Sequence, residues 1–243
     1  MTRSPNQKFC MSYYPIYLDL RNRQCLVVGA GYVGTGKVAG LLEAKARVMV
    51  VAPEASDKVA TWAAQGALIW QRRKFEASDI GAAFIVIAAT DNKALNAQVY
   101  QLANRQQRVA NAVDDLDNCN FIAPAIVRDG PVQIAVSTSG TSPGLAKQLR
   151  DRIQDEILEP HTGKLAHFLG GWRKQVKRMM PSYQDRLVFW EGVLASAVPQ
   201  LIADGEMKRA HVLLNEQLHA TAHILSEQPR LPTNRTSHVE WRR

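Results

Sequence analysis

The chain has 243 residues, of which 46% are hydrophobic and 21% charged, and its formal net charge is +8. A chain of this size can bury a sizeable core, so it fits one large domain or a domain with an appendage. No apolar run reaches the roughly 18 residues of a membrane helix, and the residues before Asp19 lack the long apolar segment of a secretory signal. We therefore expect a cytoplasmic protein that does not bind a membrane.

The spacing of the cysteines and the distribution of the positive charge argue against a zinc site and against a nucleic-acid interface. Cys10, Cys25 and Cys119 are far apart and have no zinc-ligand spacing, and Cys25 is expected in a buried strand. The positive charge is dispersed, and its main clusters at 72–74 and 173–178 are as well explained by solvated faces. Without a basic-aromatic motif we expect no nucleic-acid partner, although a basic chain also attracts small polyanions.

Short apolar runs alternate with helical patterns in the first half of the chain. Pro53 is expected to end the second strand, and Ser56 to cap the helix after it. Strands are predicted at 24–28, 46–52, 67–70, 84–89 and 109–113, and helices at 33–44, 56–65 and 93–105. This alternation with short connections predicts an α/β fold with a Rossmann-like, doubly wound parallel sheet.

The pattern changes after Asp114. Short β-type runs at 120–122, 125–128 and 132–137 are followed by a polar turn, in which Ser142 and Pro143 suit a helix start. The next helix carries an apolar residue every four positions, so one stripe should be buried: Leu145, Leu149, Ile153 and Ile157. Further helices are predicted at 162–179, 182–198 and 206–225, with breaks at Pro181 and Pro199.

These patterns predict four regions. Residues 12–114 form the Rossmann domain, 115–145 a small β-containing dimerisation region, 146–227 a C-terminal helical region, and 228–243 a loosely ordered tail.

The turn Gly29-Ala30-Gly31-Tyr32-Val33-Gly34 follows a buried strand and opens an amphipathic helix. In a dinucleotide-binding turn the first glycine permits the bend, the second lets the backbone approach the pyrophosphate, and the third allows close helix–strand packing. The helix N-terminus then offers free N–H groups to the anion. Tyr32 and Val33 belong to the same cofactor-binding turn. The competing interpretation is a tight strand–helix connection without a ligand.

Two strand ends add candidate cofactor contacts. Glu54 lies 20 residues after Gly34, the spacing of a ribose-binding acid, although an ordinary loop glutamate is as good an explanation. No Lys or Arg directly follows the strand to hold a 2′-phosphate, which favours NAD over NADP. Thr90 follows the strongest strand and is a plausible neighbour of the cofactor, whereas Asp91 is favoured as the cap of the next helix.

The catalytic candidate is Asp114, at the end of the fifth strand. A carboxylate there faces the cofactor cleft and can act as a general base, and a turn-capping role fits its position equally well. None of the tyrosines is followed four residues later by a lysine, so the short-chain dehydrogenase signature is absent.

Several separated segments, in this order, resemble the precorrin-2 dehydrogenase and sirohydrochlorin ferrochelatase family, which includes the N-terminal module of siroheme synthases. The resemblance covers about residues 12–195. The matching segments are Tyr14-Pro15-Ile16-Tyr17, Leu26 to Gly31 with Lys37, Ala88-Ala89-Thr90-Asp91, Asn111-Ala112-Val113-Asp114, Phe121 to Ala125, and Val136 to Ala146. Gly34 departs mildly, because the family usually has another small residue there.

The resemblance implies that NAD⁺ oxidises precorrin-2 to sirohydrochlorin, with Asp114 as the catalytic residue. It also implies that Ser137, Thr138, Ser139, Gly140 and Thr141 lie beside the tetrapyrrole, and that the chain forms a homodimer through the stretch after Asp114. Some family members then insert Fe²⁺, and the sequence leaves open whether this chain does. A basic protein suits a polycarboxylate substrate.

Some alternatives stay open. A module that senses NAD(H) without chemistry would also need the glycine turn, but not the segments around Asp114 and 137–143. His219 and His223 have helical i,i+4 spacing, yet they are better explained as ordinary histidines than as a metal site. Only residues 115–243 follow the Rossmann part, so we expect no fused methyltransferase domain and a separate source of precorrin-2.

Overall fold

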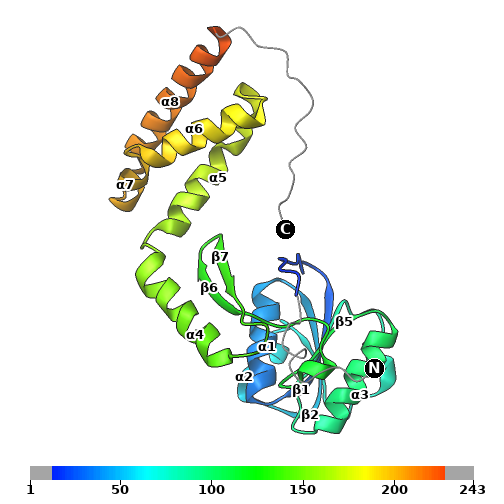
Figure 1. The fold of residues 1–243 in the computed structure, drawn as a ribbon. Helices are drawn as coiled ribbons and strands as arrows, with labels where there is room; N and C mark the ends of the chain where they lie inside the picture. Colours follow the sequence, from blue (N-terminus) through cyan, green and yellow to red (C-terminus); the bar gives the residue numbers. More distant parts are fainter. Residues whose placement is uncertain (1–12, 228–243) are drawn as a thin grey trace, which may run out of the picture. The chain divides into compact units, whose positions relative to one another are not determined.

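A computed structural model describes residues 13–227, and these fall into two compact units (Figure 1). The first unit holds the residues up to Ala125 together with Ser137–Ala146. The second holds Ile126–Val136 and the residues from Lys147 on. The tail predicted at 228–243 lies outside the described residues.

The first unit is built on a five-stranded sheet in the order β3-β2-β1-β4-β5, and every pair of neighbours is parallel. The predicted Rossmann-like sheet is confirmed. Because the chain moves outward from β1 to β3 and then returns to β4, the strand order reverses between β1 and β4, where such sheets bind ligands. The strands are β1 (Gln24–Ala30), β2 (Arg47–Ala55), β3 (Ile69–Gln71), β4 (Ile85–Ala88) and β5 (Val109–Ala112).

Helices cover both faces of this sheet (Figure 1). They are α1 (Tyr32–Glu43), α2 (Asp57–Ala64) and α3 (Lys93–Arg105). Alternate residues of β1 enter two cores: Cys25 and Val27 pack in the cluster that contains α1 and α2 residues, and Leu26 and Val28 in the cluster that contains α3 residues. Cys25 is fully buried, as predicted, and this burial raises the pKa of its thiol to about 11.

The structure corrects three details of the first unit. β2 does not stop at Pro53 but continues to Ala55, because β3 pairs only with Met49–Val51 and leaves Pro53 no partner to disrupt on that side. Asn92, not Asp91, caps α3 by accepting a hydrogen bond from Leu95 N at 3.0 Å. The run at 120–122 forms no strand, since only an isolated bridge joins Asn111 to Cys119.

The second unit contains a hairpin and a helical bundle. The hairpin consists of β6 (Ala125–Asp129) and β7 (Val132–Val136), and the helices are α5 (Thr162–Met179), α6 (Tyr183–Ala195), α7 (Val198–Ala203) and α8 (Met207–Glu227). Pro199 does separate two helices, but it does so from the first turn of α7, where proline is tolerated. The bundle core includes Phe168, Phe189, Ile202 and Leu214.

Helix α4 (Pro143–Arg152) continues into one π-helical turn, η4 (Ile153–Ile157). Ser142 caps α4 as predicted, because its Oγ accepts a hydrogen bond from Leu145 N. The predicted burial of the apolar stripe is wrong for the single chain: Leu145, Leu149 and Ile157 are 46%, 36% and 67% exposed. Among residues 13–227, no helix is long and apolar enough to cross a membrane.

Candidate nucleotide and substrate site

The three glycines between β1 and α1 have different structural roles. Gly29 has a φ of +97°, and a Cβ there would lie 2.4 Å from Ala89 O in the adjoining β4 segment. A Cβ on Gly34 would lie 2.4 Å from Gly29 O, so only glycine lets the helix pack this closely on the turn. A Cβ on Gly31 would meet nothing within 4 Å. The protein itself therefore requires Gly29 and Gly34, while Gly31 borders open space.

The N-terminus of α1 suits an anion. Gly31 is the N-cap and provides no side-chain cap, and the first turn contains no acidic residue. The helix has 12 residues, so its first N–H groups carry the partial positive charge of a full helix dipole. Tyr32 and Val33, the other predicted contacts in the turn, are exposed at this end of the helix.

A cavity of about 480 Å³ opens beside the turn, at the carboxyl ends of β1, β2 and β4. Its lining contains two carboxylates, Glu54 and Asp91, and no lysine or arginine. The full lining is Gly29, Ala30, Gly31, Ala52, Pro53, Glu54, Ala55, Ser56, Ala89, Thr90 and Asp91. The structure thus brings together Gly29, Gly31, Glu54 and Thr90 from the predicted cofactor contacts.

Ser56 is a lining residue that the sequence marked only as a helix cap. Its Oγ lies 2.7 Å from Thr35 Oγ1 of α1 and accepts a hydrogen bond from Val59 N of α2. Thr35 Oγ1 also donates to Gly31 O at 2.8 Å. These bonds tie the glycine turn to the start of α2, across the cavity edge that carries Glu54. Thr35 lies three residues after Tyr32, a position that helical spacing alone does not single out.

Asn96 of α3 determines the position of Thr90. This buried side chain accepts hydrogen bonds from Thr90 N at 3.1 Å and Thr90 Oγ1 at 2.7 Å, and it donates to Thr90 O at 2.8 Å. Thr90 is thereby fixed at the cavity wall. The sequence pattern missed Asn96, because a polar residue inside a helix is normally expected on its exposed face.

Asp114 follows β5 in a left-handed conformation, with a φ of +59°. Such a conformation is uncommon for a residue other than glycine, and aspartate is among the side chains that tolerate it. The side chain is exposed and makes no hydrogen bond or ion pair with residues 13–227. Asp114 lies at the carboxyl edge of the sheet, as the glycine turn does. Because β5 lies two strands from β1, the two are about 10 Å apart along that edge.

The segment after Asp114 folds back on β5. Asn111 Nδ2 donates to Phe121 O at 2.9 Å, and Cys119 Sγ lies 3.0 Å from Asp115 O and 3.1 Å from Ala112 O. Burial raises the pKa of the Cys119 thiol, while the positive charge of Lys37 on α1 acts in the opposite direction. Lys37 therefore places a cation near the loop that carries Asp114.

The loop 137–142 belongs to the same unit as Asp114. A Cβ on Gly140, whose φ is +81°, would lie 2.7 Å from Leu116 Cδ2, so the loop contacts the short helix η3 (Leu116–Asn118) that follows Asp114. The loop's polar groups bond mostly to one another: Thr138 Oγ1 donates to Ser142 O, Thr141 Oγ1 donates to Thr138 O, and Ser137 Oγ accepts from Ser139 N. In the described part of the chain, Ser139 Oγ makes no such bond.

Residues 13–227 contain no group of three or more His, Cys, Asp or Glu side chains that could hold a metal ion. Two of the three histidines of α8 contact other side chains. His211 packs against Phe168 and Trp172, with ring centroids 4.7 and 5.6 Å away, and His223 Nδ1 lies 3.6 Å from Glu227.

Three family models match consecutive parts of the chain. An NAD(P)-binding model matches residues 16–125, the model of the sirohaem biosynthesis protein central region matches 129–156, and the model of the sirohaem synthase dimerisation region matches 161–218. The chain resembles SirC, precorrin-2 dehydrogenase, in fold, with a TM-score of 0.69 and 24% identity over 84% of this chain and all of that one.

Siroheme synthases are similar over most of this chain. The protein from Actinobacillus pleuropneumoniae serotype 3 is 36% identical over 218 residues, which is 89% of this chain and 45% of that protein. The protein from Neisseria meningitidis serogroup C is 40% identical over 209 residues, or 86% of this chain and 43% of that protein. The chain spans less than half the length of these relatives. Over this part of their length the chain is similar to the siroheme synthases, and it matches the NAD(P)-binding, central and dimerisation models in that order.

Proposed function

We propose that the chain catalyses the NAD⁺-dependent dehydrogenation of precorrin-2 to sirohydrochlorin. The observation that carries the proposal is the position of Asp114 and the loop 137–142 at the carboxyl edge of the sheet, which also carries the glycine turn. A protein that only sensed NAD(H) would need the turn but neither of the other two.

The cavity residues fit NAD. The open space at Gly31 and the uncapped start of α1 would receive the pyrophosphate. Glu54 would accept hydrogen bonds from the ribose hydroxyls, and its negative charge would repel a 2′-phosphate. Replacing Glu54 with glutamine removes this charge, so NAD⁺ affinity should fall while that for NADP⁺ rises. Equal affinities in the variant and the wild type would contradict this role.

Asp114 would act as the general base. Bound NAD⁺ would supply the hydride acceptor, and the second hydrogen of the substrate would leave as a proton. The exposed Asp114 carboxylate would accept this proton, because no described side chain occupies its oxygens. Its left-handed backbone would hold it at the strand end. Ser139 and Lys37 would supply a hydroxyl and a cation for the polycarboxylate ring.

The test is turnover of precorrin-2 with NAD⁺, followed by the sirohydrochlorin spectrum. Asp114→Asn keeps the side-chain shape and tolerates the positive φ, but it cannot take a proton. We expect its kcat to fall by about 100-fold or more, with the affinity for NAD⁺ unchanged. Asp117→Asn, three residues along the same segment, is the matched control and should keep wild-type turnover. An inactive wild type would exclude the proposed reaction, and an active Asp114→Asn the proposed base.

A second candidate activity is the insertion of Fe²⁺ into sirohydrochlorin. The similarity to siroheme synthases favours it, because siroheme is the iron-containing product. Asp114 would then also accept pyrrole N–H protons as the metal enters. Incubation with sirohydrochlorin and Fe²⁺ or Co²⁺ tests this activity, and metal insertion no faster than in protein-free buffer would exclude it.

We also propose that the working form is a homodimer. The match to a dimerisation region supports this assembly, as does the exposed apolar stripe of α4 and η4, which is otherwise costly to leave in water. Light scattering should give the mass of two chains. A Leu149→Glu substitution should shift the equilibrium toward the single chain if the stripe is part of the interface.

A further inference from the structure

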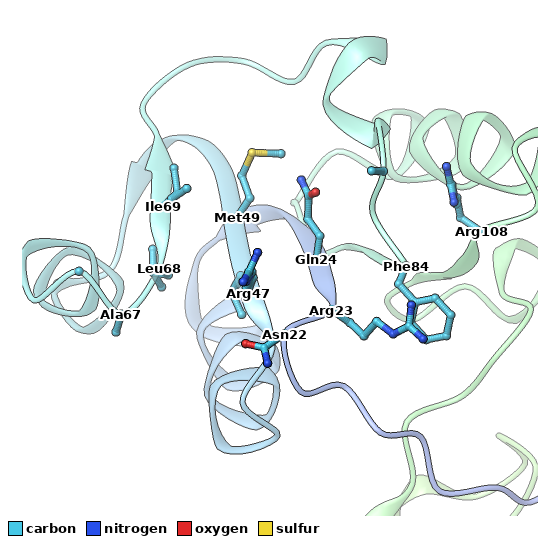
Figure 2. A pocket seen from close by; sticks show the side chains of 13 residues that line it. Asn22, Arg23, Gln24, Arg47, Met49, Ala67, Leu68, Ile69, Phe84 and Arg108 are labelled. Atoms are coloured by element: carbon cyan, nitrogen blue, oxygen red, sulfur yellow. The ribbon is translucent and has the colours of Figure 1, made fainter.

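A larger pocket, of about 700 Å³, lies at the amino-terminal edge of the same sheet (Figure 2). It is formed where the strands begin, whereas the nucleotide cavity is formed where they end. β1 has 7 residues, so the two sites are separated by about 20 Å along the strand. The lining is Asn22, Arg23, Gln24, Arg47, Val48, Met49, Gly66, Ala67, Leu68, Ile69, Ala82, Phe84 and Arg108.

The charge of this lining has one sign. Three arginines line the pocket, together with the amides of Asn22 and Gln24, and no aspartate or glutamate is among the lining residues. The remaining wall is largely apolar, and it includes Ile69, which is 61% exposed. Guanidinium groups beside an open apolar wall form a surface that suits an anion with an apolar body.

The arginines retain unused hydrogen-bonding capacity. The Arg23 guanidinium stacks on the Phe84 ring, with 5.2 Å from its central carbon to the ring centroid, and Figure 2 shows the two side by side. Arg108 Nη2 donates to Gly81 O at 2.9 Å, but its buried Nε has no acceptor among residues 13–227. Within residues 13–227, the side chain of Arg47 makes no hydrogen bond or ion pair.

A purely structural role explains these arginines poorly. Helices α1, α2 and α3 end at this sheet edge, where cations offset the negative end of a helix dipole. Yet, of the three guanidinium groups, only that of Arg108 donates to a described backbone carbonyl, and this carbonyl, of Gly81, does not belong to these helices. Arg47 lies beside Met49 in the pocket (Figure 2).

We propose that this pocket binds a small organic polyanion, with at least two carboxylate or phosphate groups on a flat apolar body. The planar guanidinium groups of Arg47 and Arg108 would each donate hydrogen bonds to an anionic group. Ile69, Leu68 and the Arg23–Phe84 pair would contact the apolar body. The helix ends disfavour an anion, so binding depends on the arginines. The site is independent of the proposed dehydrogenation.

The experiment uses the full chain saturated with NAD⁺, so that the nucleotide cavity is filled. Two probes distinguish the chemistry by isothermal titration: benzene-1,3,5-tricarboxylate for carboxylates and ADP for phosphates. We expect at least one to bind in the millimolar range or tighter. Methyl NMR should then show shifts at the Met49 and Ile69 methyl groups.

Arg47→Gln is the test variant, because the side chain of Arg47 has no described partner whose loss would unfold the protein. It should weaken binding of the probe by about tenfold or more, the effect of losing one charge-assisted hydrogen bond. The affinity of Arg47→Lys should lie between those of Arg47→Gln and the wild type. Arg72→Gln is the control, since it removes an arginine that lies outside this lining, on the ring of Trp70. Failure of both probes, or equal binding by the wild type and Arg47→Gln, would overturn the proposal.

Discussion

The buried amide of Asn96 satisfies three polar groups of Thr90: the backbone N–H, the backbone carbonyl and the side-chain hydroxyl. Asn96 lies on α3, on the far side of a turn from the cavity that Thr90 lines. A residue outside the cavity lining thus holds one that belongs to it.

Replacing Asn96 with leucine keeps a similar volume but leaves the Thr90 N–H and carbonyl without these partners. We expect a loss of about 2 to 4 kcal/mol in the free energy of unfolding, because unpaired buried polar groups each cost about 1 to 3 kcal/mol. NAD⁺ affinity should fall as well. Denaturant unfolding measures the first and titration the second. Gln98→Leu, on the exposed face of α3, is the control, and an equal effect there would argue against the Thr90 contact.

Substitutions at the glycines of the turn should separate effects on stability from effects on NAD⁺ binding. Gly34→Ala places a methyl group 2.4 Å from Gly29 O and should destabilise the fold. Gly31→Ala meets no protein atom, so its melting temperature should stay near wild type while NAD⁺ binding weakens by tenfold or more, on the order of a lost phosphate contact. Gly36→Ala, in open space on the same helix, should change neither. Unaltered NAD⁺ binding by Gly31→Ala would refute its assignment to the pyrophosphate.

The contact between Gly140 and Leu116 should control the loop beside Asp114. Gly140→Ala drives a methyl group against the Leu116 side chain and strains a backbone at φ +81°. We expect lower stability and a higher KM for precorrin-2, with NAD⁺ affinity unchanged. Adding Leu116→Ala should restore part of the loss by removing the clash, but not the backbone strain of about 1 kcal/mol. Gly144→Ala has open space and serves as the control. A double variant no better than Gly140→Ala would exclude the clash as the cause.

The Arg73–Asp79 pair should make stability depend on pH. Arg73 forms two hydrogen bonds to the Asp79 carboxylate and holds its pKa below the ordinary value of 3.8. Asp79 also accepts from Glu76 N at 2.8 Å in a capping box. Since the folded pKa is lowered, the stabilisation is complete above pH 3.8 and is lost as the pH falls through the folded value.

Urea unfolding from pH 6 down to acid measures this linkage. Asp79→Asn should lower stability at pH 6 and flatten its dependence on pH below 3.8. Asp19 also has a lowered pKa, of about 2, from its bonds with Arg21, but both side chains are exposed and solvent screens the pair. Asp19→Asn should therefore have a much smaller effect. An unchanged acid slope in Asp79→Asn would contradict the linkage.

Local patterns predicted most of the first unit. The apolar runs of β1, β2, β4 and β5 and the glycine turn were identified from composition and spacing, because parallel strands buried on both faces leave a continuous apolar signal. The sequence predicts helix caps at Ser56 and Ser142 and a helix that begins at Ser182. The side chain of each of these serines accepts a capping hydrogen bond from a backbone N–H. The positions of Glu54 and Thr90 beside one cavity follow from the same strand order.

Which side chains are buried, and which strands pair along their full length, depended on residues far apart in the chain. The stripe of α4 has a helical period, yet period alone does not say what covers it, and within this chain it stays exposed. β2 runs past Pro53 because β3 is too short to reach it.

The sequence by itself determined the doubly wound parallel sheet and the glycine turn, since these follow from hydrophobic period and backbone sterics. Only the tertiary structure decided that Asn96 holds Thr90, that Gly140 rests on Leu116, and that three arginines share a pocket without a carboxylate. Each of these depends on close approach between segments whose separation in sequence carries no periodic signal.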